Sequence, residues 1–126
     1  IETPIGEFFK RLKALPSPYL VKGRLTENAK KGRDIYYSDK TDCKGCHPAP
    51  LFTNLQMHTS IVPDQWDGSP NFDTPTIIES WRTGPWDHIG TTTDYETLLK
   101  NRLHSNCAKK LTDDEFKALM EYSLSL

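Results

Sequence analysis

The residues best suited to chemistry lie in the stretch Cys43-Lys44-Gly45-Cys46-His47, a C-x-x-C-H motif. Two thiols at this spacing, followed directly by a histidine, are typical of covalent haem attachment. We expect Cys43 and Cys46 to form thioethers to the two vinyl groups of one haem c, and His47 to bind the iron as proximal ligand. A thioredoxin-like redox pair needs no following histidine, and a zinc site needs a second ligand pair, for which only one further cysteine is present.

The other axial position of the iron has several candidates. Cys107 is the leading one, because a leftover thiol in an exported haem protein is otherwise a liability. His104 and Met57 are alternatives, since imidazole and thioether both bind haem iron, and a five-coordinate haem with an open site is a further alternative. Met120 is assigned to packing, because it lies on the apolar stripe of the last predicted helix. Ligation by anionic sulfur stabilises ferric iron and so predicts a low reduction potential.

Length and composition favour one exported domain. The chain has 126 residues, and 16 basic against 17 acidic side chains give a net charge of −1. Such a balance does not favour binding to nucleic acid, and no apolar run is long enough to predict a membrane span. Because haem c is attached outside the cytoplasm, we interpret the chain, which starts at Ile1 without a signal peptide, as a mature periplasmic protein whose leader has been removed.

Two parts of the chain are expected to differ in role. Residues 1–24 contain an amphipathic helix from Pro4 to Leu15, followed by a proline-rich link. Residues 25–126 are expected to form the haem domain. Its first helix should start at Thr26, a good N-cap, and run to about Tyr37. Gly32 lowers helix propensity there, so it is predicted to permit close approach of another helix.

The remaining pattern also favours helices. Thr74 is predicted to cap a short helix with Pro75 in its first position, and another helix is expected over residues 94–103. Thr112-x-x-Glu115 is a capping box that starts the final helix. No alternating strand pattern is present. The sequence therefore predicts an all-α fold with long loops around one covalent haem and an extra N-terminal helix.

Several motifs resemble those of a known family, the C-terminal haem domain of bacterial dihaem cytochrome c peroxidases and their MauG-like relatives. The resemblance covers about Leu25 to Leu126 and implies a class-I cytochrome c fold with His47 as proximal ligand. It also implies that His58, Arg82 and His88 line the haem edge or propionates, while Trp81 is expected among the aromatic residues around the porphyrin. The matching motifs are Leu25-x-x-x-Ala29-x-x-Gly32-Arg33-x-Ile35-Tyr36, Cys43-x-x-Cys46-His47-Pro48, Pro50-Leu51-Phe52-Thr53, Phe72-Asp73-Thr74-Pro75, Trp81-Arg82-Thr83-x-Pro85-x-x-His88-x-Gly90 and Leu111-Thr112-Asp113-Asp114-Glu115.

Two of the departures from that family bear directly on function. The chain has a single C-x-x-C-H motif, and no methionine lies between Met57 and Met120. In function it resembles more closely the small exported cytochromes with His/Cys-ligated haem, including the paired ones of anaerobic ammonium oxidisers. We therefore expect a mono-haem electron-transfer protein rather than an enzyme, with nitric oxide or carbon monoxide as candidate ligands. A haem gas sensor and a haem subunit of a peroxidase-like complex are the alternatives. Expected partners are a second haem-containing chain, in a homo- or heterodimer, and a redox partner protein.

Overall fold

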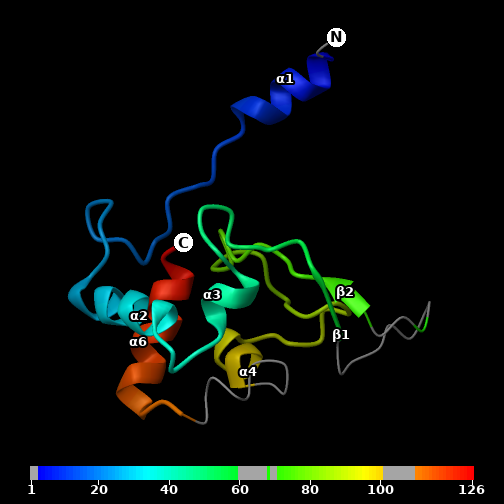
Figure 1. Cartoon of the computed structure of the whole chain (residues 1–126). Coiled ribbons are helices and arrows are strands. Elements are labelled where there is room, and N and C mark those ends of the chain that lie inside the picture. The colour runs from blue at the N-terminus through cyan, green and yellow to red at the C-terminus, as the bar shows by residue number, and fades with distance from the viewer. Residues whose placement is uncertain (1–2, 60–67, 69–70, 101–109) are drawn as a thin grey trace.

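The computed structural model describes residues 3–59, 68, 71–100 and 110–126. Within them the chain forms five helices and two short strands, arranged as Figure 1 shows. The helices and strands in chain order are α1 (Pro4–Arg11), α2 (Glu27–Tyr37), α3 (Cys43–Cys46), β1 (Met57–Thr59), β2 (Asn71–Asp73), α4 (Tyr95–Lys100) and α6 (Asp113–Leu124).

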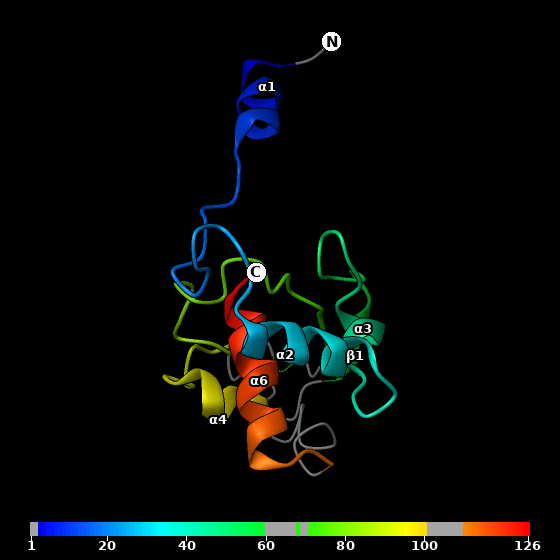
Figure 2. The ribbon, with the colours of Figure 1, turned by 90° about the vertical axis from the view of Figure 1, so that its left-hand side faces the viewer.

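Helices α2 and α6 pack directly against each other and form the centre of the fold (Figure 2). Gly32 lies at their contact. A Cβ atom built on Gly32 would lie 1.9 Å from the backbone oxygen of Ala118, so no larger residue fits without moving a helix. The predicted role of Gly32 is thereby confirmed. Next to this contact, Tyr36, Leu119 and Tyr122 form the core cluster, with the Tyr36 and Tyr122 rings 5.3 Å apart in an edge-on arrangement.

Both central helices start at the caps that the sequence predicts. The Thr26 hydroxyl accepts a hydrogen bond from the Ala29 N–H, and the Thr112 hydroxyl accepts one from the Glu115 N–H. The Glu115 carboxylate in turn accepts from the Thr112 N–H, which completes the capping box. Because these side chains satisfy N–H groups that lack a helical partner, the two helices begin at fixed residues.

The all-α prediction is wrong. Strands β1 and β2 pair as an antiparallel two-stranded sheet, with His58 opposite Phe72. The Thr59 hydroxyl donates to the side-chain oxygen of Asn71 at 2.9 Å, and the Thr74 N–H continues the pairing by donating to the Gln56 carbonyl at 3.0 Å. The fold is therefore mixed, with a small sheet beside the helices. Strands of three residues are too short to leave an alternating pattern in the sequence.

Two helix predictions need correction. The segment after Pro75 forms turns rather than a helix, because Glu79 has a φ of +62°, outside the helical region. Thr74 does not cap it, since its hydroxyl donates to the Gln56 carbonyl. Helix α1 ends at Arg11 rather than at Leu15. The helix expected over residues 94–103 is observed as α4, and residues 101–103 lie outside the described residues.

Helix α1 stands away from the rest of the molecule in both views (Figures 1 and 2), and it buries none of its residues. Its apolar side chains remain between 57% and 68% exposed, at Ile5, Phe8, Phe9 and Leu12 where the helix ends. The link after it is anchored. The Ser17 hydroxyl donates to the Leu124 carbonyl at the end of α6, at 2.5 Å. In the described ranges, no helix is both long and apolar enough to cross a membrane.

Candidate haem site

The two thiols of the C-x-x-C-H motif lie on one helical turn. Helix α3 closes through a hydrogen bond of 2.8 Å from the His47 N–H to the Cys43 carbonyl. Both cysteines are half-buried and neither forms a disulfide. Cys43 also packs against the core cluster of α2 and α6. The spacing therefore places both sulfur atoms and the histidine on one short, core-supported segment.

Hydrogen bonds to α2 and to the loop after the motif hold α3 in position. The Lys44 ammonium donates to the Tyr37 carbonyl at the end of α2, at 2.8 Å. On the other side, the Asn54 amide donates to the Gly45 carbonyl at 3.0 Å, and the Asn54 backbone N–H donates to the Cys46 carbonyl at 3.0 Å. The turn is thus fixed both to α2 and to the loop that follows the motif.

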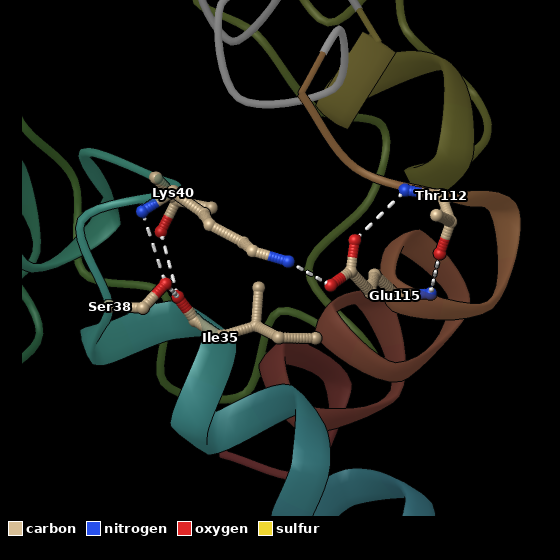
Figure 3. Close-up of polar contacts among 6 residues, drawn as sticks. Ile35, Ser38, Lys40, Thr112 and Glu115 are labelled. Atoms are coloured by element: carbon tan, nitrogen blue, oxygen red, sulfur yellow. Dashed lines mark hydrogen bonds and ion pairs between the residues drawn. The ribbon is translucent and has the colours of Figure 1, made fainter.

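The loop between α2 and α3 is itself tied to the start of α6 (Figure 3). The Ser38 hydroxyl donates to the Ile35 carbonyl at 2.7 Å and accepts from the Lys40 N–H at 3.2 Å. The Lys40 ammonium reaches across to the Glu115 carboxylate, which is already held by the Thr112 N–H. This ion pair and the capping hydrogen bond of Glu115 keep the pKa of that carboxyl below its ordinary value. The contacts connect the segment that leads to Cys43 with the N-terminus of α6.

The His47 ring is oriented through its Nδ1 atom, which lies 3.0 Å from the Phe52 carbonyl oxygen. A carbonyl can only accept, so the proton of the neutral ring is on Nδ1 and the lone pair is on Nε2. Burial lowers the pKa of His47 from its ordinary value, which favours this neutral form. A neutral imidazole whose Nδ1 proton is held by a carbonyl, with the lone pair on Nε2, is the form that binds a metal.

The carbonyl that orients His47 lies in an unusual stretch of backbone. Phe52 has a φ of +52°, and Leu55 in the same loop has a φ of +54°. A left-handed conformation is unfavourable for bulky side chains and is enriched at functional sites, where surrounding contacts enforce it. Here the Ile77 N–H donates to the same Phe52 carbonyl at 3.4 Å, and the Thr76 hydroxyl donates to the Leu51 carbonyl at 2.6 Å.

The backbone carbonyl of His47 has its own partner in the core. The hydroxyl of Tyr36, a side chain that is 1% exposed, donates to this oxygen at 2.5 Å. Burial raises the pKa of Tyr36 far above its usual range, so the hydroxyl keeps its proton and remains a donor. Neither Tyr36 as a donor nor Phe52 as an acceptor was identified from the sequence as a site residue. The only sequence signal was their presence in the motifs that surround Cys43–His47.

Two of the histidines expected at the haem periphery are brought together by Phe72. His58 is directly opposite Phe72 in the sheet, and the His88 ring stacks on Phe72 with centroids 3.7 Å apart and planes 22° from parallel. Both histidines are exposed. His58 is also close enough to His47 for its charge to lower the His47 pKa, the weakest of the effects on that ring. His47, His58 and His88 therefore lie in one region of the molecule.

The other predicted site residues have different surroundings. Arg82 is exposed, and its guanidinium pairs with the Glu79 carboxylate. Trp81 is half-buried. Met57 lies on β1 with 63% of its surface exposed. His104 and Cys107, the other two candidates for the second axial position, lie outside the described residues.

The donor set of this site fits a covalent haem. Two thiols on one helical turn, followed directly by an oriented imidazole, are what thioether attachment and proximal ligation require. Across the described residues, no group of three or more His, Cys, Asp and Glu side chains is placed to hold a metal ion.

Comparison with known proteins gives a match in structure but not in sequence. No family model and no curated protein matches the chain. One solved structure, of hydrazine synthase from Kuenenia stuttgartiensis pressurized with xenon, superposes with a TM-score of 0.77 at 22% sequence identity. The match covers 98% of this chain and 56% of that chain, so this chain spans about half the length of its structural relative. The peroxidase family suggested by the motifs is not confirmed by these comparisons. The chain shares its fold with a chain of hydrazine synthase.

Proposed function

We propose that this protein is a mono-haem c-type cytochrome that transfers electrons. The carrying observation is the His47 ring, whose Nδ1 faces the Phe52 carbonyl at 3.0 Å, directly after Cys43 and Cys46 on the turn of α3. Cys43 and Cys46 would hold the haem and His47 would be its proximal ligand. The haem iron supplies a reversible one-electron couple. The chain supplies the orientation of the imidazole, through Phe52, and keeps it neutral by burial.

For the distal position we propose the sulfur of Cys107, with His104 and Met57 as alternatives. The support is chemical: a thiol coordinated to a cation loses its proton, and an anionic sulfur ligand stabilises the ferric state. A low reduction potential follows from this ligation. A sulfur ligand held weakly in the ferrous protein would leave the iron accessible to carbon monoxide or nitric oxide.

The experiment for this proposal combines spectroscopy with one variant. We expect Cys107→Ala to lose the low-spin ferric signal in electron paramagnetic resonance and to raise the midpoint potential, while His104→Ala changes neither. A ferrous absorption spectrum that shifts on adding carbon monoxide supports a displaceable ligand. An unchanged ferric signal and potential in Cys107→Ala refute Cys107 as the ligand.

A second candidate is a haem subunit of a peroxidase-like enzyme complex. The observation in its favour is that the chain matches about half of a longer chain of an enzyme, hydrazine synthase. A complex of this kind would place further haem chemistry in another chain. Turnover of hydrogen peroxide, measured for this protein alone and together with co-expressed haem proteins, distinguishes the two candidates. Activity only in the mixture favours the subunit.

We further propose that a second haem-containing chain binds helix α1, and that the protein works in the periplasm. The apolar face of α1, with Phe8 60% and Phe9 62% exposed, supports a protein partner, because a large contiguous apolar surface is unfavourable in water. The periplasm follows from the proposed haem c, which is attached outside the cytoplasm. A redox partner protein would exchange electrons with the haem.

A further inference from the structure

The indole nitrogen of Trp81 is a buried donor without an acceptor. Among the residues that the structure describes, its Nε1 is the one buried side-chain nitrogen or oxygen that lacks a hydrogen-bond partner. Buried tryptophan N–H groups normally find a partner, because an unsatisfied buried donor is unfavourable. The neighbouring Trp86 follows this rule, since its indole N–H donates to the Ser80 carbonyl at 3.2 Å. Trp81 therefore needs an acceptor from another source.

Trp81 ends a segment that borders the candidate haem site. At the start of this segment, the Pro75 backbone is a hydrogen-bond neighbour of the His47 ring. Two residues further on, the Ile77 N–H donates to the Phe52 carbonyl that orients His47, and the Ile77 side chain packs on the same core cluster as Cys43. Trp81 follows Ile77 by four residues in the same run of turns. The unsatisfied donor thus belongs to the segment that borders the site.

We propose that the Trp81 indole N–H donates a hydrogen bond to a propionate of the haem. This inference rests on the proposed haem function. Apart from its propionates, the periphery of a haem c carries methyl groups and the two thioether links, whose sulfur is a weak acceptor, so a propionate carboxylate is the strong acceptor that the cofactor offers to a buried donor. Arg82, which the motifs suggested for the propionates, has its guanidinium paired with Glu79. Trp81 is the neighbouring residue whose donor is still unused.

Such a hydrogen bond has a measurable effect on the propionate. A donor stabilises the ionised carboxylate and lowers its affinity for a proton. Removal of a hydrogen bond to a charged group should raise that proton affinity about tenfold or more. An ionised propionate close to the iron favours the ferric state, so the midpoint potential changes with pH where the propionate titrates. In Trp81→Phe this change should move to higher pH by about one unit or more.

The test measures the midpoint potential against pH in the haem-loaded protein, as wild type, Trp81→Phe and Trp86→Phe. Trp86→Phe is the matched control, because it removes an indole whose N–H already has a protein acceptor. We expect the pH at which the midpoint potential changes to be higher in Trp81→Phe than in wild type, and to be the same as in wild type in Trp86→Phe. The proposal is overturned if this pH is unchanged in Trp81→Phe, or if it shifts equally in both variants.

A second measurement needs no variant that might misfold. In the ferrous wild-type protein labelled with nitrogen-15, the Trp81 indole N–H should be protected from exchange with solvent, and its proton shift should follow the propionate titration. An indole signal that is independent of that titration contradicts the hydrogen bond. Failure of the proposed function is distinguishable, because a chain that carries no covalent haem shows no haem absorption at all.

Discussion

Replacing Gly32 by alanine should destabilise the fold at the contact between α2 and α6. The added methyl carbon would lie 1.9 Å from the Ala118 oxygen, 2.4 Å from the Ala118 carbonyl carbon and 2.9 Å from the Tyr122 Cβ. Two of these atoms are backbone, so they cannot rotate away. The helices would have to separate by about 1.5 Å to restore ordinary contact, which also loosens the ring contact between Tyr36 and Tyr122.

The magnitude follows from two opposing effects. Overpacking of this kind costs about 1–3 kcal/mol, and here the upper end applies because backbone must move. Alanine recovers about 0.5–1 kcal/mol of helix propensity. A net loss of about 2 kcal/mol should lower the thermal midpoint by roughly 8 °C in a domain of this size.

Thermal unfolding followed by far-ultraviolet circular dichroism measures this loss directly. Gly6→Ala is the matched control, because Gly6 is also helical but its added Cβ would meet only the Thr3 hydroxyl oxygen, at 3.4 Å. The control should unfold at the wild-type temperature. A Gly32→Ala protein that is as stable as wild type would refute the close packing of α2 on α6.

Three further predictions concern the site and its surroundings. Tyr36→Phe leaves the His47 carbonyl without its donor, so the free energy of unfolding in urea should fall by about 1 kcal/mol with the haem still attached. An unchanged free energy of unfolding contradicts this contact. Because Lys40 holds the pKa of Glu115 low, the Glu115 carboxylate stabilises the fold at neutral pH and this contribution is lost as the pH falls through its folded-state pKa. Glu115→Gln should therefore show a flatter decline of stability in acid urea titrations than wild type, and an equally steep decline argues against the ion pair. Deletion of residues 1–15 should weaken association with the partner chain in light scattering without unfolding the haem domain, and a wild-type particle mass after deletion would count against α1 as the docking element.

The sequence predicted the elements whose signals are local. Thr26 and Thr112 were identified as caps because a side-chain oxygen and its N–H partner lie within three residues of each other. Gly32 was identified because a glycine in a helical pattern needs a packing reason. These residues determine where α2 and α6 begin and where the two helices contact each other. The sheet was missed because the pairing of His58 with Phe72 depends on a distant segment, and three-residue strands carry no periodicity.

The sequence identified the reactive residues of the candidate site but not their surroundings. Cys43, Cys46 and His47 form a motif whose chemistry depends on residue type and spacing alone. The orientation of His47 depends on a backbone carbonyl at Phe52, and any residue type can supply a carbonyl, so no sequence pattern records it. The prediction of a helix after Thr74 was wrong for a related reason. The Thr74 hydroxyl bonds to a carbonyl in a distant loop instead of capping its own segment, and Glu79 adopts a left-handed conformation.

The proposed function requires one covalent haem on the turn from Cys43 to His47. Intact-mass spectrometry detects this haem, when the protein is purified in denaturing solvent from cells that attach haem c. We expect a mass increased by one haem in wild type and no added haem when both Cys43 and Cys46 are replaced by alanine. A wild-type chain that is fully folded, with native helicity, but has the mass of the bare polypeptide would contradict the proposed function.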